Sequence, residues 1–131
     1  MTGFDTAWEP QWLAVVSDDA EFRLISRWTD VVLRLTDGRV DRSYRICGST
    51  IAVADAGESA PAVTLTGSPE AWTAFLTATP EPQAHHILAM QRRREDFSID
   101  GKTALLQNLN VLNRVMELMR TVASGYRRGA A

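Results

Sequence analysis

The chain is poor in cysteine, in histidine and in long apolar runs. Its 131 residues include one cysteine, Cys47, and two histidines, His85 and His86. One cysteine cannot close an intramolecular disulfide, so nothing points to an oxidising compartment. No apolar run approaches the ~18 residues of a membrane-spanning helix, and the first residues lack the basic and apolar regions of a signal peptide. We therefore expect a cytoplasmic protein without a transmembrane segment.

A surplus of positive charge is also missing. The chain has 14 basic and 16 acidic residues, which gives a formal net charge of -2. Such a chain has no overall positive field to attract nucleic acid, so we expect no nucleic-acid partner. Hydrophobic residues make up 45% of the sequence, as in ordinary globular proteins. We expect one domain over residues 1–131, with residues 125–131 as a frayed tail.

The two histidines do not form a recognisable metal or catalytic motif. Adjacent residues on a helix diverge by about 100°, so His85 and His86 cannot bind one metal ion together, and the chain has no third histidine. We assign no metal, no cofactor and no catalytic residue. An acid/base pair of His86 with a carboxylate such as Asp96 remains an alternative, although no phosphate loop or nucleophile motif accompanies it.

Alternating apolar residues predict a β-hairpin over residues 30–46. Asp37 and Gly38 separate two alternating runs, a pattern typical of a two-residue type I′ turn. That register places Leu33 opposite Arg42. Arg42 would then lie on the apolar face, where its charge must reach solvent or a partner.

The remaining segments follow either strand or helix periodicity. Two further alternating runs predict an antiparallel four-stranded meander, and helical spacing predicts the helices around it. The expected later elements are a helix over 18–28 capped by Ser17 or Asp18, strands within 49–57 and 60–67, a helix capped by Ser68, a helix over 84–93, a strand over 96–100 and a last helix ending near Gly125. This order predicts a single α+β domain with a curved, mainly antiparallel five-stranded sheet covered by helices.

Two segments resemble a known family. "VTLTGSPEAWTAFL", followed by "FSIDGKTALLQNLNVLNRVMEL", is similar to the sterol-carrier-protein-like (SCP-2-like) lipid-binding domain, best over residues 62–118. The resemblance implies a curved sheet and helices that enclose a hydrophobic tunnel for fatty acyl chains, sterols or related lipids. The segment "TATPEPQAHHILAMQRRRE" is longer and more helical than in that family. We expect its residues His86, Ile87 and Met90 to form part of the tunnel wall or lid, with a histidine as a polar contact for a headgroup.

The resemblance and the apolar helices together define the candidate site. The same apolar stripes would be ordinary core if packed tightly, and would line a tunnel if packed loosely. The predicted ligand-binding residues are Trp72, Phe75, His86, Ile87, Met90, Leu105, Leu109, Leu112 and Met116.

The predicted function is non-catalytic binding or transfer of an apolar ligand. One alternative is a small α+β enzyme, an isomerase, hydrolase or cyclase, that uses His86 in the same pocket. Another is an interaction subunit with an apolar helix face. Transient membrane contact and a homodimer are both left open. The preferred interpretation of the basic run "RRRED" is a solvated helix end, and the alternative is a contact with phosphate or a lipid headgroup.

Overall fold

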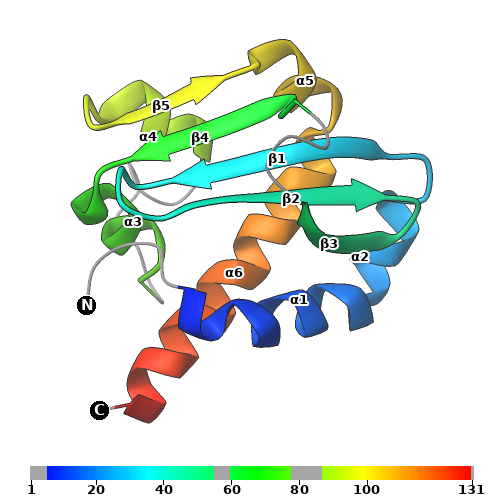
Figure 1. Ribbon diagram of the computed structural model, residues 1–131, viewed down its shortest axis with the longest axis horizontal. Coiled ribbons are helices and arrows are strands. Elements are labelled where there is room, and N and C mark those ends of the chain that lie inside the picture. The colour runs from blue at the N-terminus through cyan, green and yellow to red at the C-terminus, as the bar shows by residue number, and fades with distance from the viewer. Residues whose placement is uncertain (1–5, 55–59, 78–86, 131) are drawn as a thin grey trace.

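A computed structural model describes residues 6–54, 60–77 and 87–130 (Figure 1). Helices at both ends of the chain flank a run of four consecutive strands, and a fifth strand lies between the later helices, which is an α+β arrangement. The elements are η1 (Thr6–Trp8), α1 (Glu9–Asp18), α2 (Ala20–Ile25), β1 (Asp30–Thr36), β2 (Asp41–Cys47), β3 (Thr50–Ala54), β4 (Val63–Gly67), α3 (Pro69–Phe75), α4 (Ile87–Arg93), β5 (Phe97–Asp100), α5 (Lys102–Gln107) and α6 (Leu109–Ala130).

The five strands form one open, mixed sheet in the order β3-β2-β1-β4-β5. The sequence predicts a meander with β4 beside β3, and this prediction is wrong. β4 instead pairs in parallel with β1, with Leu33 beside Val63 and Leu35 beside Leu65. The other three pairings are antiparallel. Burial accounts for the order: four of the seven β1 residues are buried against one of five in β3, so β1 takes the centre and β3 the edge.

The hairpin turn between β1 and β2 lies one residue later than predicted. The Asp37 backbone N–H donates to the Val40 carbonyl at 3.1 Å, so Gly38 and Arg39 lie at the tip in place of Asp37 and Gly38. The Asp37 carboxylate accepts the backbone N–H groups of Arg39 and Val40, at 2.9 and 2.8 Å, and this holds the turn. Arg42 consequently lies opposite Leu35 rather than Leu33. The register moves by two residues, which keeps every side chain on its predicted face because strands alternate with period two.

The N-terminal helical region breaks at Asp19. The sequence predicts a helix over 18–28, with Trp12, Leu13 and Val16 at helical spacing before it; in the structure the earlier segment is α1, which ends at Asp18, and the predicted helix is the shorter α2, which begins at Ala20. Asp19, rather than Ser17 or Asp18, is the N-cap, since its carboxylate accepts the Phe22 N–H at 2.8 Å.

The C-terminal elements follow the prediction more closely. Ser68 caps α3 by accepting the Ala71 N–H at 3.0 Å, and β5 lies where its alternation places it. Within the helix predicted over 84–93, α4 is described from Ile87, and residues 84–86 lie outside the described part. The last helix is divided at Asn108 into α5 and α6, and α6 continues past Gly125 instead of ending there.

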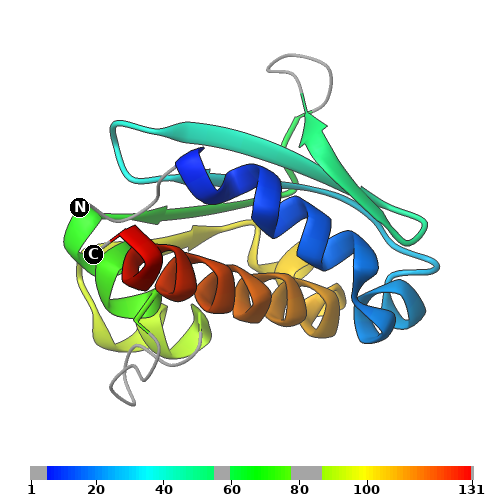
Figure 2. The ribbon, with the colours of Figure 1, turned by 90° about the horizontal axis from the view of Figure 1, so that it is seen from below.

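Helices cover one face of the sheet, and Figure 2 shows α1 and α6 side by side beneath it. The Trp12 indole N–H of α1 donates to the Val115 carbonyl of α6 at 3.1 Å, and the Trp12 ring packs edge-on against Tyr44 of β2. Exposed ion pairs, Arg34 with Asp41 and Arg45 with Asp30, lie between β1 and β2. Among the described residues, no helix combines the length and the hydropathy needed to cross a bilayer.

Candidate functional site

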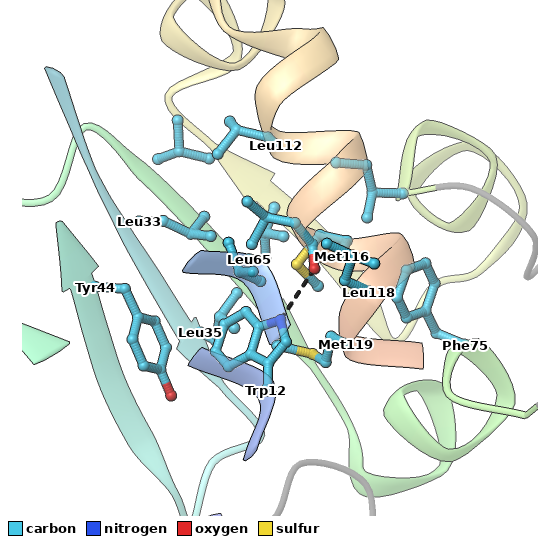
Figure 3. Packing of buried hydrophobic residues seen from close by; sticks show 14 of the residues in the cluster. Trp12, Leu33, Leu35, Tyr44, Leu65, Phe75, Leu112, Met116, Leu118 and Met119 are labelled. Atoms are coloured by element: carbon cyan, nitrogen blue, oxygen red, sulfur yellow. Dashed lines mark hydrogen bonds between the residues drawn. The ribbon is translucent and has the colours of Figure 1, made fainter. Parts of the chain in front are cut away.

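The apolar face of the sheet and the inner face of α6 meet in one hydrophobic interior. Leu33 and Leu35 of β1 and Leu65 of β4 point from the sheet toward Leu112 and Met116 of α6 (Figure 3). All five side chains are at most 1% exposed. The central strands therefore form one wall of this interior and α6 forms the opposite wall.

Seven of the nine predicted ligand-binding residues belong to this single buried cluster. They come from four helices that are separate in the sequence, and each is at most 2% exposed. The seven are Trp72 and Phe75 of α3, Ile87 and Met90 of α4, Leu105 of α5, and Leu112 and Met116 of α6. The sequence thus selected residues that the fold brings to one place.

The other two predicted residues stand differently. His86 lies outside the described residues. Leu109 is half-buried and packs against the interior, but it also lines an open depression of about 520 Å³ with Ile25 and Thr29. Leu109 is therefore at the boundary between the interior and the surface.

Trp72 is fixed by several contacts at once. Its indole N–H donates to the Thr36 carbonyl at 3.0 Å, and its ring packs edge-on against Phe75 and Phe97, at centroid distances of 6.1 and 5.6 Å. A Cβ added at Gly67 would lie 3.1 Å from the Trp72 indole nitrogen. Trp72 thus holds α3 against the sheet, and Gly67 leaves the room that its ring needs.

Arg120 is a buried cation at the edge of the interior that the sequence reading missed. It is 9% exposed, its Nε donates to the Phe75 carbonyl at 2.6 Å, and its guanidinium lies 4.4 Å from the centroid of the Phe75 ring. Burial lowers the pKa of Arg120, although an arginine remains charged in water at neutral pH. The missed signal is spacing: Leu112, Met116 and Arg120 follow one another at intervals of four, so they share one helix face.

A second buried polar group links α1 to β2. The Glu9 carboxylate accepts hydrogen bonds from Arg42, at 2.9 and 2.6 Å, and from the Tyr44 hydroxyl, at 2.5 Å. Arg42 thus has the partner that its place on the apolar face requires. Burial disfavours the Glu9 charge, but these hydrogen bonds outweigh it and lower the pKa of Glu9. Burial first, and then Glu9, raises the pKa of Tyr44, which keeps it protonated as the donor.

Asp96, the partner suggested for His86 in the catalytic alternative, is already engaged. It accepts hydrogen bonds from Arg94, at 2.8 and 3.0 Å, and from the Ser68 hydroxyl, at 2.5 Å. These interactions lower the pKa of Asp96 to about 2, so it would be a weak base. Within the described ranges, no group of three histidine, cysteine or acidic residues is arranged to hold a metal ion.

Comparison of the whole structure with known proteins decides the fold. No family model and no curated protein matches the sequence. The crystal structure of sterol carrier protein 2 superimposes with a TM-score of 0.66 at 13% identity, over 88% of this chain and 95% of that one. This chain has the sterol-carrier-protein fold.

Two further structures with the same fold support this assignment. A conserved hypothetical protein of Thermus thermophilus, described as a candidate sterol carrier protein, superimposes with a TM-score of 0.61 at 17% identity, over 92% of this chain and 90% of that one. The ubiquinone synthesis protein UbiJ-SCP2 gives 0.57 at 13% identity, over 83% and 91%. The resemblance found in the sequence is therefore confirmed for the fold across most of the chain.

Proposed function

We propose that this protein is a non-catalytic cytoplasmic carrier that binds one apolar ligand, such as a fatty acyl chain, a sterol or a similar lipid. The ligand would lie between the sheet and helices α3, α4, α5 and α6. The main support for this proposal is the hydrophobic interior between the sheet and the helices. Seven of the ligand-binding residues predicted from the sequence lie there in one apolar cluster, within a sterol-carrier-protein fold.

The side chains of this interior suit a hydrocarbon ligand. Met90, Met116 and Met119 come from α4 and α6, and an unbranched methionine can change its rotamer to accommodate an irregular shape. Each buried CH₂ contributes about 0.8 kcal/mol, so a 16-carbon chain would gain about 12 kcal/mol before the costs of association. Affinity should therefore rise with chain length until the interior is filled.

Arg120 provides a polar group for the head of such a ligand. A guanidinium binds a carboxylate more strongly than a neutral hydroxyl, and the effect increases where water is scarce. Arg120 is 9% exposed and lies against Phe75, one of the predicted ligand-binding residues. We therefore propose a ligand with a carboxylate head, such as a fatty acid, in preference to a neutral sterol.

The first experiment is native mass spectrometry of the purified protein, followed by extraction and identification of what dissociates. An apolar adduct, together with displacement of a fluorescent fatty acid, would support the carrier function. A protein that carries nothing and binds neither fatty-acid nor sterol probes would refute it.

A pair of variants locates the ligand. Met116→Phe adds a larger side chain inside the interior and should weaken the binding of long fatty acids by about tenfold, because the ring occupies space that the ligand would need. Leu106→Phe makes the same kind of change at a residue that is 53% exposed, and it should leave binding unchanged. Equal affinity of the two folded variants would remove the interior as the binding site.

The head-group assignment has its own test. Arg120→Met should weaken binding of a fatty acid by about tenfold while leaving the corresponding fatty alcohol unaffected, because only the acid carries the charge that the guanidinium attracts. Equal losses for acid and alcohol in a folded variant would show that Arg120 only supports the structure.

The two alternatives predict different results. A catalytic role needs turnover that depends on His86, although the engagement of Asp96 with Arg94 and Ser68 disfavours this pair. An interaction subunit would show a mass in size-exclusion chromatography that rises with concentration while the protein remains free of ligand.

A further inference from the structure

Helix α5 is held to the rest of the molecule by few contacts. One of its six residues, Leu105, is buried, whereas three of the seven residues of α3 are buried. Lys102, Thr103, Leu106 and Gln107 are exposed. Among the residues that the structure describes, no side chain of α5 forms a hydrogen bond or an ion pair with another element. The packing of Leu105 therefore decides how firmly α5 is held.

Open depressions lie on both sides of α5, which Figure 1 shows between β5 and α6. Ile25, Leu109 and Val111 line the depression of about 520 Å³. Leu88 lines a second depression of about 370 Å³, and Leu106 of α5 borders both. Val111 belongs to the buried cluster, and the other three lining side chains, Ile25, Leu88 and Leu109, pack against it. A displacement of α5 would therefore join two depressions that each reach side chains of the interior.

Both ends of α5 are suited to such a displacement. Gly101, the residue before α5, has φ +84° and its backbone lies close against Ala62, so it can serve as a fixed pivot with the dihedral freedom of glycine. Asn108 separates α5 from α6, and its N–H is shared between the carbonyls of Ala104 and Leu105, both at 3.2 Å. Hinges are commonly residues of this kind at the ends of an element.

We propose that α5 is a movable lid, and that the apolar ligand enters and leaves the interior when α5 turns away from the sheet about Gly101 and Asn108. This inference rests on the proposed carrier function. Leu105 holds the lid closed, since it is 0% exposed and packs within the buried cluster. The neighbouring helices form fixed walls, because Trp72 ties α3 to the sheet and Trp12 ties α1 to α6 by hydrogen bonds.

Hydrogen exchange in the ligand-free protein tests the movement without any substitution. The amides of Leu105 and Asn108 report on α5, and the Leu76 amide, which donates to the Trp72 carbonyl at 2.9 Å, is the matched control because α3 is a similarly short helix. The two α5 amides should exchange at least about tenfold faster than that of Leu76. Their rates should hardly change up to about 1 M urea, since a local opening exposes little surface. Exchange of the α5 amides at the rate and urea dependence of Leu76 would overturn the proposal.

Stopped-flow binding of a fluorescent fatty acid tests whether this movement admits the ligand. Truncating a buried leucine shifts a packing equilibrium by about 30-fold or more, so Leu105→Ala should raise the association rate by about that factor. The reason is that the association rate follows the population of the open state. The dissociation rate should rise with it, because the ligand leaves through the same opening.

Two further variants serve as comparisons. Leu112→Ala removes the same atoms from an equally buried position on α6 and should act mainly on the dissociation rate, since α6 does not move. Val53→Ala, at a 40% exposed position on β3, should change neither rate. Circular dichroism checks that each variant is folded.

The outcomes separate the lid from the function on which it rests. Faster association of Leu105→Ala than of Leu112→Ala supports the lid. Equal association rates for these two folded variants would overturn the lid and leave the carrier function standing. A wild-type protein that binds no fatty-acid probe would refute the carrier function, and the lid as an entrance with it. If Leu105→Ala does not fold, the exchange of the wild-type amides decides.

Discussion

Replacing Glu9 by glutamine should destabilise the protein strongly, although the change keeps the size of the side chain. The Glu9 side chain is 8% exposed and accepts two hydrogen bonds from Arg42 and one from Tyr44. A glutamine amide would retain one acceptor oxygen and turn an NH₂ group toward donors. Breaking a buried pair typically costs 3–5 kcal/mol. Because the Arg42 side chain is 36% exposed and can regain water, we expect about 2–3 kcal/mol.

The assay is urea and thermal unfolding followed by circular dichroism. For 131 residues, a loss of 1 kcal/mol lowers the Tm by about 3–4 °C, so Glu9→Gln should lower it by about 6–12 °C. The matched control is Asp41→Asn, which breaks an ion pair whose side chains are 40% and 50% exposed and should cost less than about 1 kcal/mol. Equal losses in the two variants would refute the reasoning that burial makes the Glu9 cluster important.

The pH dependence of the same variant gives an independent check. The folded-state pKa of Glu9 is lowered, so the unfolded chain takes up a proton first as the pH falls. Its contribution to stability is complete above the ordinary glutamate pKa of about 4.3 and is lost as the pH falls through the lower folded value. The difference in stability between wild type and Glu9→Gln should therefore shrink between pH 6 and pH 3. A constant difference would show that charge is not the cause.

Three substitutions at other backbone and capping sites have well-defined expected effects on stability. Gly101 has φ +84°, and an added Cβ would lie 1.9 Å from the Ala62 carbonyl oxygen, so Gly101→Ala should lower the free energy of unfolding by more than about 3 kcal/mol. Gly125 lies in α6, and an added Cβ there would meet no atom within 4 Å, so Gly125→Ala should stabilise the protein by about 0.5–1 kcal/mol. Ser68→Ala removes the N-cap of α3 and the hydrogen bond to Asp96, and it should lower the free energy of unfolding by about 1–2 kcal/mol. Urea unfolding measures all three, and a Gly101→Ala protein as stable as wild type would contradict the close approach of β5 to β4.

Which features the sequence predicts depends on how local their causes are. The Ser68 N-cap, the helix α3 that follows it and the alternation of β5 depend on residues that are neighbours in the sequence, and the structure confirms all three predictions. The predicted position of the β1–β2 turn is wrong, but the buried face of each strand is still predicted correctly, because a register shift of two residues preserves the alternation of side chains. The candidate residues met in one cluster because helical spacing fixes which side chains share a face.

The errors concern partners that are distant in the sequence. Alternation in β4 shows that it is a strand but not that it will pair with β1 instead of β3. The partner of Arg42 is Glu9, 33 residues away, and no local pattern links them. The chain also turns at Asp19, where a carboxylate that caps α2 and binds Arg114 of α6 interrupts an apolar periodicity that would otherwise continue. These features depend on tertiary contacts that compete with local preference.

The parallel pairing of β1 with β4 sets the order in which the chain can fold. β2 follows β1 after four residues, so their hairpin closes a short loop, whereas β4 begins 27 residues after the last residue of β1. Closing the longer connection costs more entropy, and the contacts that repay it come from helices still later in the chain. The hairpin should therefore form early and the β1–β4 junction late. Both β1 and β4 contribute residues to the hydrophobic interior, namely Leu33, Leu35 and Leu65. The interior would therefore be enclosed only in the final stage of folding, when these two strands pair.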